Sequence, residues 1–251
     1  MDDKLLELVG ESMHELRVFN ERLLTSTQHL GKSVKLTKIG EKEPLSCNYV
    51  HADEIRTSIN NIVHLIKLSN VRMDFIDYEL NPDFFSASPP YGVDLYNKFV
   101  ANRITLNSTC KKHKVKITIG EKPKNLSMVN AVSLIDILPF LLLDNAVKYS
   151  PNECEVDVEF FEYSEEIEIK VKSIGPHIPQ RELKRLVTKG YRGLSVRATN
   201  KVKGQGIGLY FADKIVKLHD ARMELNSSEP IFTIDDTSYS EFTVTLRFPK
   251  V

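Results

Sequence analysis

The apolar residues of the first eighty positions recur at alternating intervals of three and four, and this feature constrains the fold most. One series runs through residues 6–30 and a second through residues 55–76. Such spacing is typical of long helices that pack lengthwise on others. The polar segment 31–48 between them turns the chain back. Because two narrow seams cannot cover each other fully, we predict an antiparallel helical hairpin over residues 1–80 that pairs with a second copy into a four-helix bundle, as a homodimer.

From residue 91 onwards the pattern is mixed. Residues 93–113 have helical spacing, and residues 133–150 predict a mostly buried helix that Pro139 should kink. Alternating, strand-like stretches are residues 114–120, 154–163, 166–175, 221–228, 230–235 and 240–249. The side chains expected to face inward from the central pair of strands are Val156, Val158, Phe160, Ile167, Ile169 and Val171. The sequence therefore predicts an α+β fold, with helices gathered on one face of a mixed, mostly antiparallel sheet.

Composition excludes several classes of function. The 34 basic and 34 acidic residues cancel, so no net field attracts nucleic acid or an anionic membrane. Cys47, Cys110 and Cys154 lie far apart without a CxxC pair, which argues against a disulfide framework and a zinc site. The amino terminus is acidic where a signal peptide is basic, and no apolar run is long enough to span a bilayer. We expect a cytoplasmic protein without a nucleic-acid partner.

Two short segments carry polar groups that suggest phosphate chemistry. In FLLLDNAVKYSP, Asn145 and Lys148 follow an apolar run at the end of a helix. In KGQGIGLYFADKI, Gly204, Gly206 and Gly208 open directly into a helix, where bare backbone N–H groups and the helix amino end favour an anion. Neither a P-loop nor a dinucleotide fingerprint fits the context. Taken singly, the glycines equally predict a flexible loop, and Asn145 and Lys148 a helix cap and a solvated lysine.

Four segments together resemble, in order and spacing, the nucleotide-binding boxes of the sensor histidine kinases. They are LLLDNAVKYSP, VKSIGPHIP, LVTKGYRG and GQGIGLYFADKIVKLHDARMEL. Upstream, HELR at residues 14–17 resembles the start of the phosphoacceptor box of that family. The resemblance implies a dimerisation and phosphoacceptor hairpin over residues 1–80. It also implies an ATP-binding catalytic domain of the Bergerat (GHKL) fold over residues 91–251.

The resemblance also implies roles for single residues. His14 is expected to accept the phosphoryl group, and Glu15 to hold the imidazole and take its proton. Asn145 is expected to bind Mg²⁺ through its amide oxygen, Lys148 to lie near the transferred phosphoryl group and Tyr149 to pack beside the nucleotide. The other expected contacts to ATP are Ser173, Gly175, Arg192, Gly204, Gly206, Gly208 and Leu209. The implied partner is the receiver domain of a response regulator, whose aspartate takes the phosphoryl group from His14.

Several positions depart from the family pattern. Leu141 stands where a second asparagine is usual, and His177 where a glycine is usual. Ser173 stands where an aspartate usually accepts a hydrogen bond from the adenine amino group. Val18 replaces the polar residue that usually follows the phosphoacceptor box, so we expect poor phosphatase activity. We expect His177 to be a surface or lid residue rather than a ligand.

These departures leave alternatives open. A nucleotide-binding pseudokinase or scaffold that signals through its dimeric bundle is the main one. A serine kinase of the anti-sigma type normally lacks the long hairpin, and a gyrase-like ATPase needs a glutamate where Leu141 stands. For Arg192 and Arg197 two interpretations remain, contact with the γ-phosphate or solvated loop charges.

Overall fold

The computed structural model describes residues 16–18, 20–28, 49–81, 83, 85, 87–199 and 206–250. The chain divides into two compact units, Met1–Pro82 and Asp83–Val251, and each is described by itself. Within the described ranges, no helix has both the length and the apolar character needed to cross a membrane. The roles predicted for residues 1–80 and 91–251 are taken up below as proposals.

The first unit is helical where it is described. Residues 16–18 and 20–28 are helical, and α2 spans Tyr49–Leu80. The helix predicted for residues 55–76 is thereby confirmed. His14, Glu15 and the connection 31–48 lie outside the described residues.

Part of the apolar surface of α2 is exposed in the single chain. Ile59, Ile66 and Met73 are separated by seven residues and are 45%, 44% and 44% exposed. Val63 and Leu80, on the same stripe, are also exposed. A stripe with this repeat matches the seam of a coiled coil or bundle.

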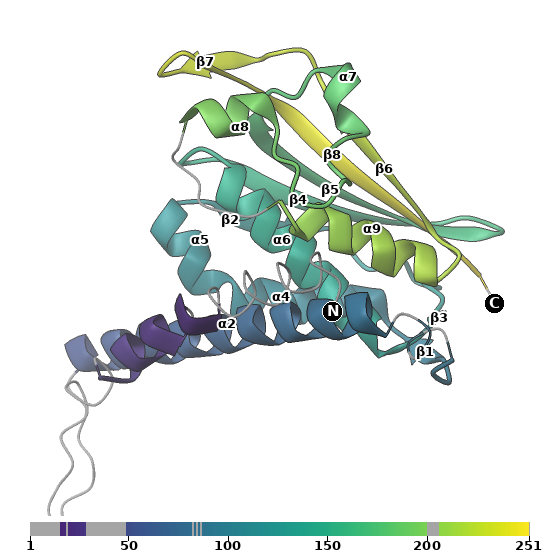
Figure 1. Ribbon diagram of the computed structural model, residues 1–251, viewed down its shortest axis with the longest axis horizontal. Helices are drawn as coiled ribbons and strands as arrows, with labels where there is room; N and C mark the ends of the chain where they lie inside the picture. The colour runs from purple at the N-terminus through teal and green to yellow at the C-terminus, as the bar shows by residue number, and fades with distance from the viewer. Residues whose placement is uncertain are drawn as a thin grey trace, which may run out of the picture. The chain divides into compact units, whose positions relative to one another are not determined.

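The second unit is built on a six-stranded sheet (Figure 1). Five strands follow the order β2-β4-β5-β8-β6, and β7 pairs with β8 beside this path. Only the β2–β4 pair is parallel. The strands are β2 (Lys116–Ile119), β4 (Glu155–Glu162), β5 (Glu166–Pro176), β6 (Arg222–Ser227), β7 (Phe232–Ile234) and β8 (Thr237–Pro249). A separate small pair joins β1 (Tyr91–Val93) to β3 (Val129–Ala131). The predicted α+β fold with a mixed, mostly antiparallel sheet is confirmed.

The helices of this unit cover one face of the sheet. Figure 1 shows α4, α6 and α9 along that face, with the short α7 and α8 near one end. The helices are α4 (Leu95–Thr105), α5 (Asn107–His113), α6 (Leu138–Tyr149), α7 (Gln180–Leu183), α8 (Leu194–Thr199) and α9 (Gly208–Leu218). All six side chains predicted to face inward from β4 and β5 are buried. The core therefore lies between the sheet and these helices.

The predicted kink at Pro139 is wrong. The chain forms a 3₁₀ helix, η1, over Ser133–Ile137, and α6 begins immediately after it, with the proline in its first turn. Proline suits this position because the first N–H groups of a helix have no intrahelical acceptor. Pro139 therefore lies in the first turn of α6 instead of inside a longer helix.

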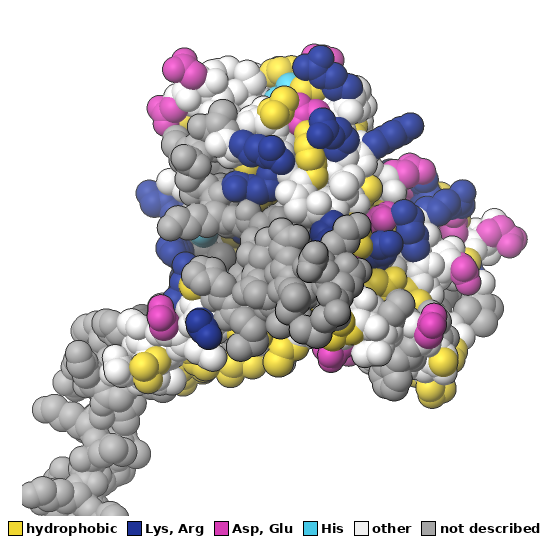
Figure 2. All heavy atoms as spheres, viewed as in Figure 1, with side chains coloured by type: hydrophobic (Ala, Val, Ile, Leu, Met, Phe, Trp, Pro, Cys, Tyr) yellow, Lys and Arg dark blue, Asp and Glu magenta, His cyan; other side chains and the backbone are white. Residues whose placement is uncertain are grey.

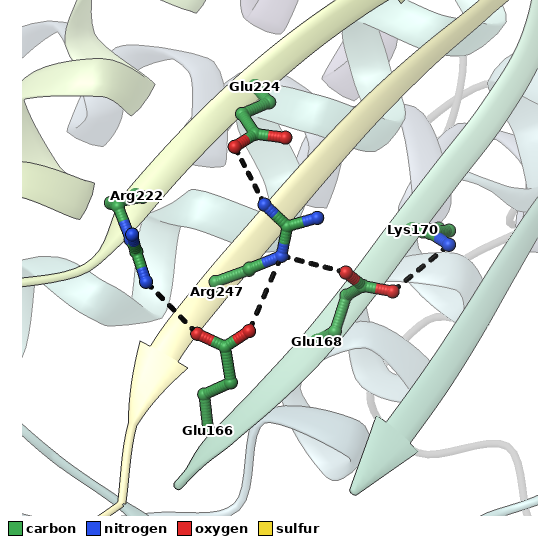
Figure 3. A network of polar contacts seen from close by, with 6 residues as sticks. All are labelled: Glu166, Glu168, Lys170, Arg222, Glu224 and Arg247. Atoms are coloured by element: carbon green, nitrogen blue, oxygen red, sulfur yellow. Dashed lines mark hydrogen bonds and ion pairs between the residues drawn. The ribbon is translucent and has the colours of Figure 1, made fainter. Parts of the chain in front are cut away.

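The opposite face of the sheet carries a charged network (Figure 3). Arg247 on β8 donates from Nε to Glu168 Oε2 on β5 at 2.8 Å and from Nη1 to Glu224 Oε1 on β6 at 2.7 Å. Burial alone would raise the pKa of Glu168, but hydrogen bonds from Lys170 and Arg247 outweigh it and lower that pKa. The carboxylate is thus kept ionised although it is buried, and Arg247 joins β8 to β5 and β6 across the outer face.

A buried histidine ties α9 to the start of the helical layer. The Val132 N–H donates to His219 Nε2 at 3.0 Å, and His219 Nδ1 lies 2.6 Å from the Ile215 carbonyl oxygen. One ring nitrogen must accept and the other must donate, so these contacts require the neutral imidazole protonated at Nδ1. Burial lowers the pKa of His219.

Mild acid should therefore destabilise this unit through His219. Below about pH 6.5 the unfolded chain binds a proton that the folded imidazole resists, so stability falls as the pH drops, by at most about 1.4 kcal/mol per pH unit. In His219→Gln this contribution is absent. Urea unfolding between pH 7.5 and 5.5 should show a wild-type stability that falls more steeply than that of the variant. Parallel pH profiles would contradict the assignment.

Candidate functional site

The end of α6 presents three of the predicted site residues on one helical face. Asn145, Lys148 and Tyr149 are each half-buried, whereas Ala146 and Val147 are buried in the core. Positions i, i+3 and i+4 of a helix point the same way. Burial of the apolar side of α6 therefore brings an amide, an ammonium group and a phenol together.

The segment between α7 and α8 reaches this face through Arg192. Burial raises the pKa of Tyr149, and a hydrogen bond with Arg192 opposes that effect. Lys148 Nζ lies 5.9 Å from the centre of the Tyr149 ring. The structure thus brings Lys148 and Tyr149 of one sequence motif together with Arg192 of another.

The end of β5 supplies Ser173 and Gly175. The Ser173 hydroxyl donates to the Phe242 carbonyl on β8 at 3.5 Å, which leaves its oxygen as an acceptor. A Cβ added at Gly175, or at Gly208 on α9, would meet no described atom within 4 Å. Both glycines thus border open space, and this fits a site that a nucleotide enters.

The glycine cluster is partly described. Gly206 has φ +71°, and a Cβ there would lie 2.4 Å from the Tyr191 carbonyl oxygen, so this position requires glycine. Gly208 is the first residue of α9, and Gly204 lies outside the described residues. Leu209 packs against the cluster of Ile178, Leu183 and Leu186, so its side chain serves the core of this region.

Glu182 is a residue that the sequence did not single out. Its carboxylate is buried, and Oε2 accepts hydrogen bonds from the Tyr191 hydroxyl at 2.9 Å and from the Leu194 N–H at 3.1 Å. The guanidinium groups of Arg185 and Arg197 lie 4.4 Å and 5.4 Å from the centre of the Tyr191 ring. Glu182 and Tyr191 therefore fix both ends of the short turn that carries Arg192. In the sequence, the only sign that could have pointed to Glu182 is its position as one acidic residue in a basic stretch.

That stretch is strongly basic. Residues 180–199 contain Arg181, Lys184, Arg185, Lys189, Arg192 and Arg197. Figure 2 shows Lys and Arg side chains gathered around α7 and α8 on the viewed face. Cations around an open space favour an anionic ligand.

His177 and Leu141 lie outside the cluster of candidate ligands. His177 Nδ1 lies 3.4 Å from Ser240 Oγ, and the His177 carbonyl accepts a hydrogen bond from Ser195 on α8. The histidine therefore helps to hold α8. Leu141 is buried in the core.

The residues present fit a magnesium ion that is bound mainly through phosphate. Within the described part of the chain, no group of three or more His, Cys, Asp or Glu side chains is placed to hold a metal. Mg²⁺ is commonly held by one or two protein oxygens together with phosphates and water. The Asn145 amide oxygen is the protein ligand that the described site offers.

Part of this unit is similar to known proteins. Residues 140–250 match the family of histidine kinase-, DNA gyrase B- and HSP90-like ATPases. The sensor protein KdpD of Clostridium acetobutylicum is 26% identical over 133 residues, which is 53% of this chain and 14% of that protein. The sensor protein QseC of Escherichia coli K12 is 30% identical over 137 residues, 55% of this chain and 26% of that protein. The chain thus spans about a quarter or less of the length of these two relatives.

Solved structures share the fold. The catalytic domain of histidine kinase ThkA, 15% identical, superposes with a TM-score of 0.52 over 65% of this chain and 99% of that one. The Acinetobacter baumannii histidine kinase AdeS, 16% identical, gives a TM-score of 0.50 over 94% of this chain and 98% of that one. Residues 140–250 are therefore similar to the histidine kinase-, DNA gyrase B- and HSP90-like ATPases, and the second unit shares the fold of histidine kinase catalytic domains.

Proposed function

We propose that the protein is an ATP-dependent protein histidine kinase that phosphorylates His14 and passes the phosphoryl group to a response-regulator aspartate. The observation that carries the proposal is the joint placement of Lys148, Tyr149 and Arg192 at the end of α6. Gly175 and Gly208 border open space in the same unit. A basic segment, an amide oxygen and a helix amino end are the groups that a triphosphate with its metal requires.

Each site residue has a proposed part in the reaction. Asn145 would hold Mg²⁺, which neutralises charge on the phosphates when bound. Lys148 and Arg192 would stabilise charge on the transferred group, and Ser173 would accept a hydrogen bond from adenine. The neutral imidazole of His14 attacks the γ-phosphorus as the bond to the ADP oxygen breaks, and Glu15 takes the proton from the ring.

A second function is favoured by two observations. Leu141 is buried where the family has an asparagine, and the Ser173 hydroxyl is uncharged and already bonded to Phe242. The first change removes a candidate ligand for the metal, and the second replaces a charged acceptor for the adenine amino group with an uncharged one. A pseudokinase that binds nucleotide and signals through its helical hairpin is consistent with them.

Radiolabel transfer decides between the two functions. With Mg²⁺ and γ-phosphate-labelled ATP, the wild type should acquire label that survives alkali and is lost in acid. His14→Gln and Asn145→Ala should abolish it, while His51→Gln, a change of another histidine of the same unit, should retain it. Absence of label from a protein that still binds ATP would favour the pseudokinase. Absence of binding would contradict both functions.

The contacts of Glu182 predict a difference between ATP and ADP. Glu182→Ala or Tyr191→Phe frees the turn that carries Arg192, the residue proposed to reach the γ-phosphate. Loss of the charge-assisted hydrogen bond between Arg192 and the γ-phosphate should weaken ATP binding about tenfold. ADP affinity should change much less, because ADP lacks the γ-phosphate.

Isothermal titration of both nucleotides measures this difference. Glu229→Ala, which removes an exposed carboxylate elsewhere, serves as the matched control for Glu182→Ala. Equal losses for ATP and ADP, accompanied by a lower melting temperature, would assign Glu182 a purely structural part.

We also propose that the protein is a homodimer through the exposed stripe of α2. Ile66→Glu places a charge in the middle of the stripe and should shift the protein from dimer to monomer in light scattering. Asn61→Glu adds the same charge at an exposed polar position of the same helix and should leave the mass unchanged. A monomeric wild type, or a dimeric Ile66→Glu variant, would contradict the interface.

A further inference from the structure

The second unit contains a cavity beside β2, in addition to the proposed nucleotide site. Its volume is about 680 Å³, within the usual range for ligand sites. The lining comes from α4, α5, β2 and the start of β4, and from none of the proposed nucleotide ligands. It includes the apolar side chains Ile104, Val115 and Ile117 and the thiols of Cys110 and Cys154.

Lys116 and Ile117 of β2, the terminal strand of the sheet, line the cavity. Strand β2 is the terminal strand, and its only partner among the described strands is β4. The Lys116 N–H donates to the carbonyl of Cys154, just before β4, and the Gly120 N–H donates to the Val158 carbonyl of β4. Successive residues of a strand direct their backbone groups to opposite sides, so Ile117 and Ile119 direct theirs towards the free edge. A free edge of this kind can pair with a strand from another chain.

The rim of the cavity is cationic. Arg103, Lys111, Lys114 and Lys116 line it, against the two carboxylates of Glu153 and Glu155. Lys114 pairs with Glu153 at 3.6 Å and Lys116 with Glu155 at 2.9 Å. The remaining two cations, Arg103 and Lys111, are exposed, and they form no ion pair within the described part of the chain. The cavity therefore has a net positive charge beside a strand edge.

Exposed apolar surface lies next to these charges. Ile104 is 63% exposed at the cavity, whereas Leu95 and Phe99 of the same helix are buried. An occupant must therefore offer backbone hydrogen bonds, carboxylates and apolar side chains together. A compact inorganic anion supplies only charge, whereas an extended acidic peptide supplies all three.

We propose that this cavity docks an extended acidic segment of a partner protein, which adds as a strand to the outer edge of β2 and directs its carboxylates to Arg103 and Lys111. The backbone pairing gives affinity, and the charges select an acidic partner over a basic one. The site is separate from nucleotide binding and does not depend on the proposed kinase activity.

The proposal can be tested with a fluorescein-labelled Glu-Val-Glu-Val-Glu-Val peptide and the full chain, by fluorescence anisotropy at about 0.15 M salt, where distant charges are screened. The peptide should bind, and the same sequence with lysine in place of glutamate should not. A version N-methylated at alternate residues keeps every charge but loses backbone donors, so it should bind at least about tenfold more weakly. If the N-methylated peptide bound as tightly as the unmodified one, the binding would reflect only electrostatic attraction of a polyanion. That result would overturn the proposal.

Two matched variants locate the site. Lys111→Glu should weaken peptide binding at least about tenfold, whereas Lys124→Glu, the same change at an exposed lysine outside the cavity, should leave it unaltered. Bound peptide should also slow alkylation of Cys154, followed by mass spectrometry. Equal binding by both variants, or unchanged alkylation of Cys154 at saturating peptide, would contradict docking at this cavity. Retention of nucleotide binding by Lys111→Glu would confirm that the domain is folded.

Discussion

Helix α6 must be surrounded by apolar side chains, because eight of its twelve residues are buried. The sheet, α4 and α9 supply that surrounding, with Ile167, Ile169 and Val171 of β5 fully inside the core. Rotation of α6 about its own axis would expose apolar residues on one side and bury Asn145 and Lys148 on the other, at a cost of several kcal/mol. The orientation of the candidate site is therefore a consequence of core packing.

The segment that covers the site is held differently. Between α7 and α8 the chain depends on the Glu182 carboxylate, the Tyr191 ring with its two guanidinium neighbours, and the close approach of Gly206. These are a few polar contacts and one small apolar cluster, so local opening of this segment costs less free energy than unfolding of the sheet. Because the segment between α7 and α8 is less stable than the sheet, it can open for a ligand without disturbing α6.

Sequence patterns predicted the elements better than the contacts between them. Strict alternation identified β4 and β5 and even their buried residues, since a half-solvated antiparallel strand leaves that trace. Pro139 was misread because proline at a helix start and proline inside a helix look alike until the boundary with η1 is known. The bond between Ser173 and Phe242 depends on the register of β5 with β8, and the bond between Tyr149 and Arg192 depends on the path of a loop. Neither leaves a local signal, and the same is true of His219, whereas Glu182 is marked only as one acidic residue in a basic stretch.

The two helix ends at the site have opposite electrostatic character, and the described contacts bring them together. Tyr149, the last residue of α6, is bonded to Arg192; the preceding Tyr191 lies against Gly206, two residues before α9 begins. The carboxyl end of α6 carries partial negative charge and favours a cation, whereas the amino end of α9 carries partial positive charge and favours an anion. A metal-bound polyphosphate would match this polarity, with Asn145 as the candidate residue for holding the cation and the N–H groups near Gly208 as candidates for the anion. A lone anion at α9 would leave the end of α6 uncompensated except by Lys148. The dipoles therefore favour a metal-bound polyphosphate over a simple phosphate.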